Sequence, residues 1–239
     1  TGNPYSEQID NAMKSDSQAV FGDVIWHVND QLNLTVGLRH TRDEKSFTWF
    51  NRPRTAAELD RTMFNLNALG LLASIPPQLL TVLRNNIVFG NAVGVTVKRD
   101  GDWNDTSPRF VLDYAFTPDT MVFLSASKGY KAGGNDGVQI NSEYAPEKVR
   151  NYELGIKNVF RDWNMSLNAS IYHYDYSDRQ SLQLVPASTS SSIPQYVVQS
   201  TDQSADGLDV EWLWKASSQL TLNLSAAYID STFDDGATT

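Results

Sequence analysis

Hydrophobic and polar residues alternate along most of the chain, and turn sequences divide the alternating stretches into pairs. Residues 109–116 read RFVLDYAF, with hydrophobic residues at the even positions. Successive side chains of a strand point to opposite faces, so this pattern predicts one hydrophobic and one more polar face. The turn sequence Thr117-Pro118-Asp119 follows, and residues 121–130 return with similar alternation. This part of the chain is therefore predicted to form an amphipathic hairpin.

The same unit recurs along the chain, with short turns inside each hairpin and longer polar connections between hairpins. The predicted hairpins span about residues 17–41, 107–130, 148–179 and 204–233. The pattern predicts an all-β protein, an antiparallel up-and-down meander of about eight strands.

One long connection, residues 42–106, interrupts the hairpins and is predicted to be partly helical. Thr55 and Glu58 have the spacing of a capping box, and leucine and methionine recur at helical spacing up to residue 72. Pro76-Pro77 ends this helix, and residues 78–84 form a second short one. Loops of this length are usually functional lids or binding loops. Asp100 begins a calcium-loop-like sequence, but Asp105 stands where that loop requires glycine, so no calcium site is expected.

Composition excludes several function classes. The net charge of -9 argues against a nucleic-acid partner. The absence of cysteine excludes disulfides, cysteine-ligated zinc and a cysteine nucleophile. The three histidines, His27, His40 and His173, lie in no catalytic or metal-binding motif. The sequence therefore predicts no enzyme activity, no catalytic residue, no metal site and no cofactor.

Alternation alone fits both a soluble sandwich and a membrane β-barrel, whose strands need no long apolar run. Three features favour the barrel: strands of ten or more residues, a second face rich in Asn, Ser, Thr, Asp and Glu, and aromatic residues near strand ends. Two aromatic groups would form girdles at the membrane surfaces. One lies near short turns and the other near long loops: Trp26, Trp163, Trp212 and Trp214; Tyr130, Tyr172, Tyr174 and Tyr176.

Several short motifs occur in a recognisable order. KGYKAGG ends a strand at residues 128–134, Pro146-Glu147 follows, and residues 151–157 read NYELGIK. GLRHT at 37–41 and GLDVE at 207–211 are further strand motifs. Together they resemble the barrel of TonB-dependent outer-membrane receptors. The resemblance covers most of the chain outside residues 51–104.

The resemblance implies an outer-membrane protein of a Gram-negative bacterium that takes up a scarce solute, such as a ferric siderophore. Such receptors have about 22 strands and a plug, and an inner-membrane TonB complex energises them. The chain shows no plug domain or energy-coupling box, so it is expected to be a partial barrel, residues 1–239, that reaches the TonB complex through a plug absent here. Membrane lipid and lipopolysaccharide are further expected partners.

Ligand-binding residues are expected on the lumen-facing side of the strands near the outer mouth, or on the long loops. Arginine and lysine there would attract an anionic ferric chelate, and tyrosine would stack on sugars or catecholates. The candidates are Arg39, Arg42, Tyr130, Lys131 and Asn135. Basic residues at such a rim also commonly pair with lipopolysaccharide or with neighbouring acids.

Two other interpretations stay open at this point. Eight strands could close into a small outer-membrane barrel with a structural or adhesin role. Alternatively, a soluble carbohydrate-binding β-sandwich would cover the Leu32, Leu34, Val36 and Leu38 face with a second sheet.

Overall fold

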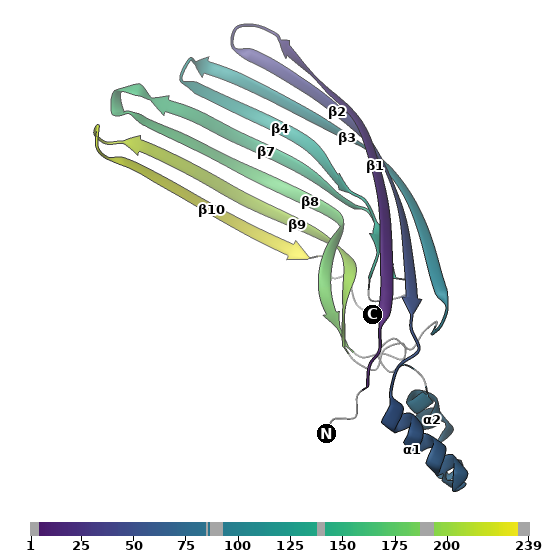
Figure 1. The fold of residues 1–239 in the computed structure, drawn as a ribbon. Coiled ribbons are helices and arrows are strands. Elements are labelled where there is room, and N and C mark those ends of the chain that lie inside the picture. Colours follow the sequence, from purple (N-terminus) through teal and green to yellow (C-terminus); the bar gives the residue numbers. More distant parts are fainter. Residues whose placement is uncertain (1–4, 85, 87–92, 138–141, 187–193, 234–239) are drawn as a thin grey trace.

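A single open antiparallel sheet dominates the computed structural model, which describes residues 5–84, 86, 93–137, 142–186 and 194–233. Its eight strands follow one another in chain order, apart from a small two-stranded sheet set aside between β4 and β7 (Figure 1). The main strands are β1 Ile9–His27, β2 Leu32–Asn51, β3 Thr96–Thr117, β4 Thr120–Lys131, β7 Glu147–Phe160, β8 Met165–Val185, β9 Gln195–Lys215 and β10 Thr221–Phe233.

Short turns close the four hairpins at one end of the sheet. Between β1 and β2 the Asn29 side chain accepts hydrogen bonds from the backbone N–H groups of Gln31 and Leu32, both at 2.9 Å. Local bonds of this kind make asparagine a turn-forming residue. Between β3 and β4, Thr117 Oγ1 accepts a bond from the Asp119 N–H at 3.2 Å. The meander of about eight strands predicted from the alternation is therefore confirmed.

Direct cross-strand partners share a face of the sheet, and one row of them is hydrophobic from edge to edge. We call the face that carries this row the outer face and the opposite one the inner face. The row comprises Trp26, Leu34, Leu112, Leu124, Leu154, Ile171, Leu208 and Tyr228.

No second layer of the described residues packs on the outer face, because each strand contacts its sheet neighbours almost exclusively. Leu38 is 55% exposed and Val36 is 39% exposed. The β-sandwich interpretation, which required a covering sheet on this face, is wrong. The described strands β1 and β10 are the two edges of the sheet and do not pair with each other. The eight strands therefore form an arc rather than a closed small barrel.

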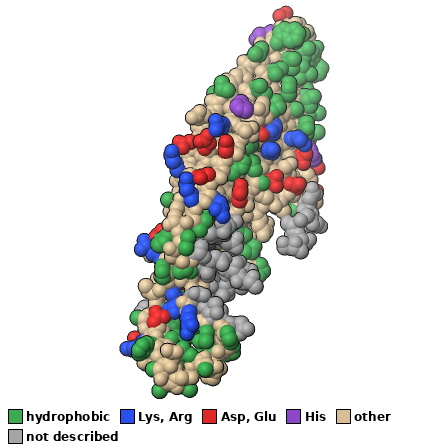
Figure 2. Space-filling model, turned by 90° about the vertical axis from the view of Figure 1, so that its right-hand side faces the viewer, with side chains coloured by type: hydrophobic (Ala, Val, Ile, Leu, Met, Phe, Trp, Pro, Cys, Tyr) green, Lys and Arg blue, Asp and Glu red, His purple; other side chains and the backbone are tan. Residues whose placement is uncertain are grey.

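The hydrophobic part of the outer face is a belt next to the short turns, and polar residues replace it further along every strand. On β2 the belt runs from Leu32 to Leu38, and on β7 from Phe160 to Tyr152. The next outer positions beyond the belt are Gln18, His40, Thr106, Lys128, Arg150, His173, Asp206 and Asp230. Hydrophobic side chains accordingly gather at the upper end of the sheet in Figure 2, and charged ones lie below them in the middle of the molecule.

The strands extend further from the short turns than the sequence indicated. β2 continues to Asn51 and β3 begins at Thr96, so the loop predicted at 42–106 shortens to residues 52–95. Asp100 and Asp105 lie within β3 rather than in a loop. β8 and β9 likewise extend beyond residues 179 and 204, to Val185 and back to Gln195.

The connection between β2 and β3 contains two α-helices with a 3-10 turn between them: α1 Ala57–Ala68, η1 Leu71–Ser74 and α2 Pro77–Arg84. The N-cap of α1 is Ala56 and makes no side-chain bond, so the predicted capping box is wrong. Arg54 instead anchors both helices, because its Nη2 contacts Asp60 Oδ1 at 2.7 Å and the Leu83 carbonyl oxygen at 2.8 Å. Neither described helix is long and apolar enough to cross a membrane.

The two predicted aromatic girdles have different outcomes. Trp26, Trp212 and Trp214 lie on the outer face near the short turns. The tyrosine girdle is wrong for Tyr172 and Tyr174, which pair with Glu153 and Asn151 on the inner face, and for Tyr176, which shares their parity. These tyrosines have the opposite parity to Ile171, so they cannot face the same medium.

Candidate ligand-binding face at the loop end

The inner face is crossed near the long loops by a segment that leaves the sheet after β4. Strand β4 pairs with β3 only as far as Ser127, although it pairs with β7 up to Lys131. The chain then turns inward and forms the small sheet of β5 Gly134–Asn135 and β6 Glu143–Tyr144. We call residues 132–137 and 142–145 the crossing segment.

Glycine is required where the crossing segment packs. A Cβ atom on Gly133 would lie 2.6 Å from the Tyr144 carbonyl oxygen and 2.9 Å from the Trp103 ring. A Cβ atom on Gly134 would lie 2.5 Å from the Tyr144 hydroxyl. Any other residue would have to push these neighbours away, so the last two glycines of the KGYKAGG motif serve close packing.

Hydrogen bonds hold the crossing segment to strands on both sides of it. Trp49 Nε1 donates to the Asp136 carbonyl oxygen at 3.0 Å, and Lys45 Nζ donates to the Gly133 carbonyl oxygen at 2.7 Å. On the other side, Gln180 Nε2 donates to the Ala132 and Ala145 carbonyl oxygens at 3.1 and 2.9 Å. These bonds connect β2 with β8 across the concave side of the sheet.

A small hydrophobic core lies beneath the crossing segment. Phe47 is 6% exposed and Trp49 is fully buried, although both lie on the inner face of β2. Their rings are 4.3 Å apart. On the opposite side Val197 and Ala205 of β9 are also buried. The inner face is therefore dry at the loop end, where the crossing segment covers it.

Three carboxylates lie near Tyr130, and two of them, Asp43 and Asp105, are buried. Lys128 Nζ lies 2.5 Å from Asp105 Oδ1, and the Asp105 side chain is 4% exposed. Burial, together with the nearby Asp43, Asp105 and Asp102 carboxylates, raises the pKa of Tyr130 to about 12. The phenol is therefore neutral at physiological pH.

Lys45 is a second perturbed group in this part of the molecule. Burial lowers the pKa of its ammonium group, Asp43 opposes that shift, and Lys131 adds to it. The ammonium also lies 5.7 Å from the centre of the Trp103 ring, at cation–π distance.

The candidate ligand residues do not form one cluster. Arg39 is on the inner face, where Nε bonds Thr41 Oγ1 at 3.1 Å and the guanidinium lies 5.5 Å from the Phe21 ring centre. Lys131 is exposed and 3.8 Å from Glu147, Tyr130 is half-buried, and Asn135 lies in β5. Arg42 is on the outer face, paired with Glu44 at 2.7 Å and Asp102 at 3.4 Å.

Sequence reasoning missed the residues that build this face. Trp49 and Asp136 meet across 87 sequence positions, and Gln180 reaches Ala132 across 48. No local pattern carries such contacts. The sequence nevertheless contains one signal, because aromatic residues recur from Phe47 to Phe50, beyond the end of the predicted strand. Such residues are not expected in a purely polar loop.

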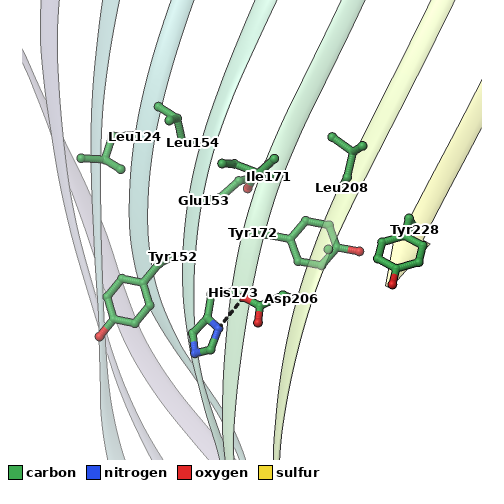
Figure 3. Close-up of a pocket in the computed structure, with 11 residues that line it drawn as sticks. Leu124, Tyr152, Glu153, Leu154, Ile171, Tyr172, His173, Asp206, Leu208 and Tyr228 are labelled. Atoms are coloured by element: carbon green, nitrogen blue, oxygen red, sulfur yellow. Dashed lines mark hydrogen bonds and ion pairs between the residues drawn. The ribbon is translucent and has the colours of Figure 1, made fainter. Parts of the chain in front are cut away.

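A hollow of about 470 Å³ lies on the outer face at the border of the hydrophobic belt (Figure 3). Leu124, Leu154, Ile171 and Leu208 line it on the belt side. On the loop side His173 Nδ1 lies 2.9 Å from Asp206 Oδ1. None of the residues that line this hollow belongs to the crossing segment, so it is separate from the candidate ligand-binding face. The described residues contain no cluster of three metal-ligating side chains.

A sheet with an exposed hydrophobic belt outside and a polar, partly covered surface inside is part of a transmembrane β-barrel wall. The chain belongs to the TonB-dependent receptor family, because the model of the TonB-dependent receptor-like β-barrel matches residues 1–239. Receptors of this family are outer-membrane transport proteins rather than enzymes.

Solved structures with low sequence identity share this fold. The ferric yersiniabactin uptake receptor FyuA of Yersinia pestis superimposes with a TM-score of 0.66 at 16% identity, over 95% of this chain and 28% of that receptor. The siderophore receptor PiuA of Acinetobacter baumannii gives a TM-score of 0.59 at 15% identity, over 93% of this chain and 26% of that one.

A sequence relative is the metal-pseudopaline receptor CntO of Pseudomonas aeruginosa. It is 26% identical over an alignment of 148 residues, and the match covers 58% of this chain and 20% of the receptor. The present chain therefore spans a minor part of the length of the receptors it matches.

Proposed function

We propose that this chain is part of an outer-membrane receptor that takes up a chelated metal, such as a ferric siderophore, with energy from the TonB complex of the inner membrane. The observation that carries the proposal is the pairing of an uncovered hydrophobic belt with a concave inner face that bears aromatic and charged groups at the loop end. Such a wall fits a pore that opens toward the outside medium and binds a solute at its mouth.

The relatives support the solute class. A yersiniabactin receptor, a siderophore receptor and a metal-pseudopaline receptor are all named for metal chelates. Coupling to TonB would pass through a plug domain inside the barrel. The proposed membrane is the outer membrane of a Gram-negative bacterium, with lipid and lipopolysaccharide around the belt.

Among the candidate ligand residues, the inner-face position favours Arg39 and the exposure favours Lys131. Arg39 has no carboxylate partner among the described residues, so its guanidinium is available to an anionic chelate. The Lys131–Glu147 contact is long and exposed, and such pairs are weak. Asn135 would contribute amide hydrogen bonds from β5, and Tyr130 would support them from beneath.

Arg42 is proposed to have a different role, since its two carboxylate partners lie with it on the outer face. It would stabilise the wall outside the pore and would not contact the solute. It is therefore the matched control for Arg39: both are arginines of β2, three positions apart and on opposite faces.

The test is transport by the whole protein in a strain that lacks its own copy. Iron-limited cultures would receive a panel of ferric catecholate, hydroxamate and mixed chelates labelled with radioactive iron, with and without a functional TonB complex. We expect at least one chelate to accumulate only when receptor and TonB are both present. Arg39→Ala should reduce its uptake roughly tenfold, and Arg42→Ala should not. Equal accumulation without the receptor, for every chelate, would contradict the proposal.

A further inference from the structure

The loop-side ends of the sheet form two arms that the sheet itself does not hold together. The first arm consists of the ends of β1, β2 and β3, and the second of the ends of β8 and β9 (Figure 1). Four strands separate β2 from β9 in the sheet order. Strand β4 leaves β3 after Ser127 and ends at Lys131, so the ladder between the arms is interrupted there.

The crossing segment spans this interruption, and Asp136 is the residue that contacts both arms. Its carbonyl oxygen accepts the Trp49 Nε1–H bond from β2 at 3.0 Å. Its carboxylate Oδ2 accepts a bond from the Val198 backbone N–H of β9 at 3.1 Å. Its own N–H donates to the Ser142 carbonyl oxygen at 3.0 Å, within the crossing segment. Asp136 is 6% exposed, so these bonds are shielded from water.

Further contacts of the crossing segment reinforce both connections. Asn11 of β1 donates from Nδ2 to the Gly137 carbonyl oxygen at 2.9 Å. Gln180 of β8 holds Ala132 and Ala145 together from the other arm. The glycine contacts with Tyr144 and Trp103 leave the crossing segment little freedom to shift.

We propose that the crossing segment is a strut that fixes the distance between the two arms, and that Asp136 is its positioning residue. By fixing that distance, the strut sets the width of the mouth on this side of the wall. The effect on solute entry rests on the proposed function, whereas the effect on the distance between the arms does not.

The strut is tested by a distance measurement that needs no ligand. Spin labels at Ala12→Cys of β1 and Tyr196→Cys of β9 report the separation of the arms, because both positions are exposed and neither bonds to the crossing segment. Double electron–electron resonance on the whole protein in lipid nanodiscs gives the distance distribution. We expect one narrow distribution, broadened about twofold or more by Asp136→Ala, because alanine keeps the backbone bonds to Trp49 and Ser142 but loses the carboxylate that accepts the Val198 bond from the second arm.

Conservative and control variants separate positioning from general damage. Asp136→Asn retains an oxygen that accepts the Val198 bond, so it should restore the narrow distribution. Trp49→Phe keeps a ring in place but removes the donor to Asp136, and should broaden it less than Asp136→Ala. Asp202→Ala removes a similar bond, in which Asp202 Oδ1 accepts from the Asp178 N–H at 2.8 Å within the second arm, and should change nothing.

Folding of each variant is checked by its heat-dependent migration in detergent gels, which reports the closed barrel. A distribution that stays narrow in a folded Asp136→Ala variant would overturn the strut. So would equal broadening by Asp136→Asn and Asp136→Ala. Because the measurement is made without solute, either result leaves the uptake proposal standing, and a failed uptake assay leaves the strut standing.

Discussion

The turn-side and loop-side halves of the strands carry opposite polarity on their two faces. In the turn-side half, the outer face of β2 bears Leu34 and Val36 and the inner face bears Asn33 and Thr35. In the loop-side half, the outer face bears Arg42 and Glu44, while Phe47 and Trp49 are buried on the inner face. Along the single strand β2, the hydrophobic side chains thus change from the outer face to the inner face within a few residues.

The exchange shows that the medium on each side, rather than the strand itself, decides which parity is hydrophobic. Beside the belt the outside is hydrocarbon and the inside is polar. Beyond the belt the outside is water, and the crossing segment makes the inside dry. The backbone pairing does not change where the polarity of the faces changes, since β1, β2 and β3 stay paired across the edge of the belt.

The largest expected effect comes from the core beneath the crossing segment. Trp49→Ala removes a fully buried ring and its bond to Asp136, and should destabilise the protein by about 3–5 kcal/mol. Trp26→Ala is the matched control, because Trp26 is 61% exposed on the outer face of β1. Urea unfolding in lipid vesicles, followed by fluorescence, measures both. Equal losses would show that the loop-side inner face is not a core.

A charge placed inside the belt should have the next largest effect. Leu34→Arg puts a guanidinium on the outer face, where the hydrocarbon cannot solvate it, at a cost of about 2–4 kcal/mol. His40→Arg lies on the same strand and face just beyond the belt, and should cost about 0–1 kcal/mol. The same vesicle unfolding assay compares them. If Leu34→Arg left the stability unchanged, the hydrocarbon of the membrane would have to contact a different part of the strands.

A buried and an exposed ion pair should differ by a smaller amount. Asp105→Ala leaves the Lys128 ammonium, which is 26% exposed, without its close carboxylate, and should cost about 2 kcal/mol. Asp16→Ala breaks the Lys14–Asp16 pair, whose side chains are 79% and 60% exposed, and should have almost no effect. The comparison is made at low and high salt, since only the exposed pair is strongly screened.

The turn-side half of the fold could be predicted from the sequence, because a single medium lies on each side of it. There the parity of Leu32 to Leu38 persists long enough to define a strand and a face. The loop-side half could not be predicted in the same way. Along residues 41–51 both parities mix charged and aromatic residues, so no two-residue period marks the strand, although β2 continues to Asn51.

The candidate site was predictable only in part, for a related reason. Arg39 and Lys131 stand out as cations near strand ends, and parity alone already separates Arg39 from Arg42. The role of Asp136 depends on contacts with Trp49 and Val198, which are distant in sequence and leave no local pattern. Sequence periodicity reports the face of a strand, but it does not report what covers that face.

The smallest expected effect is a change of stability at high pH that originates at Tyr130. The folded-state pKa is raised from 10.0 to about 12, so the folded protein keeps the phenol proton where the unfolded chain releases it. The native state thus binds more protons between these values, and its stability should fall as pH rises from about 10 to about 12. Tyr130→Phe cannot ionise and should flatten that part of the profile, whereas Tyr228→Phe, on the exposed outer face of β10, should leave it unchanged. Urea midpoints across this pH range measure the slope. Parallel profiles for the parent and Tyr130→Phe would show that the carboxylates around the phenol are too well screened to hold its proton. The loop-side inner face would then be wetter than the burial of Trp49 implies.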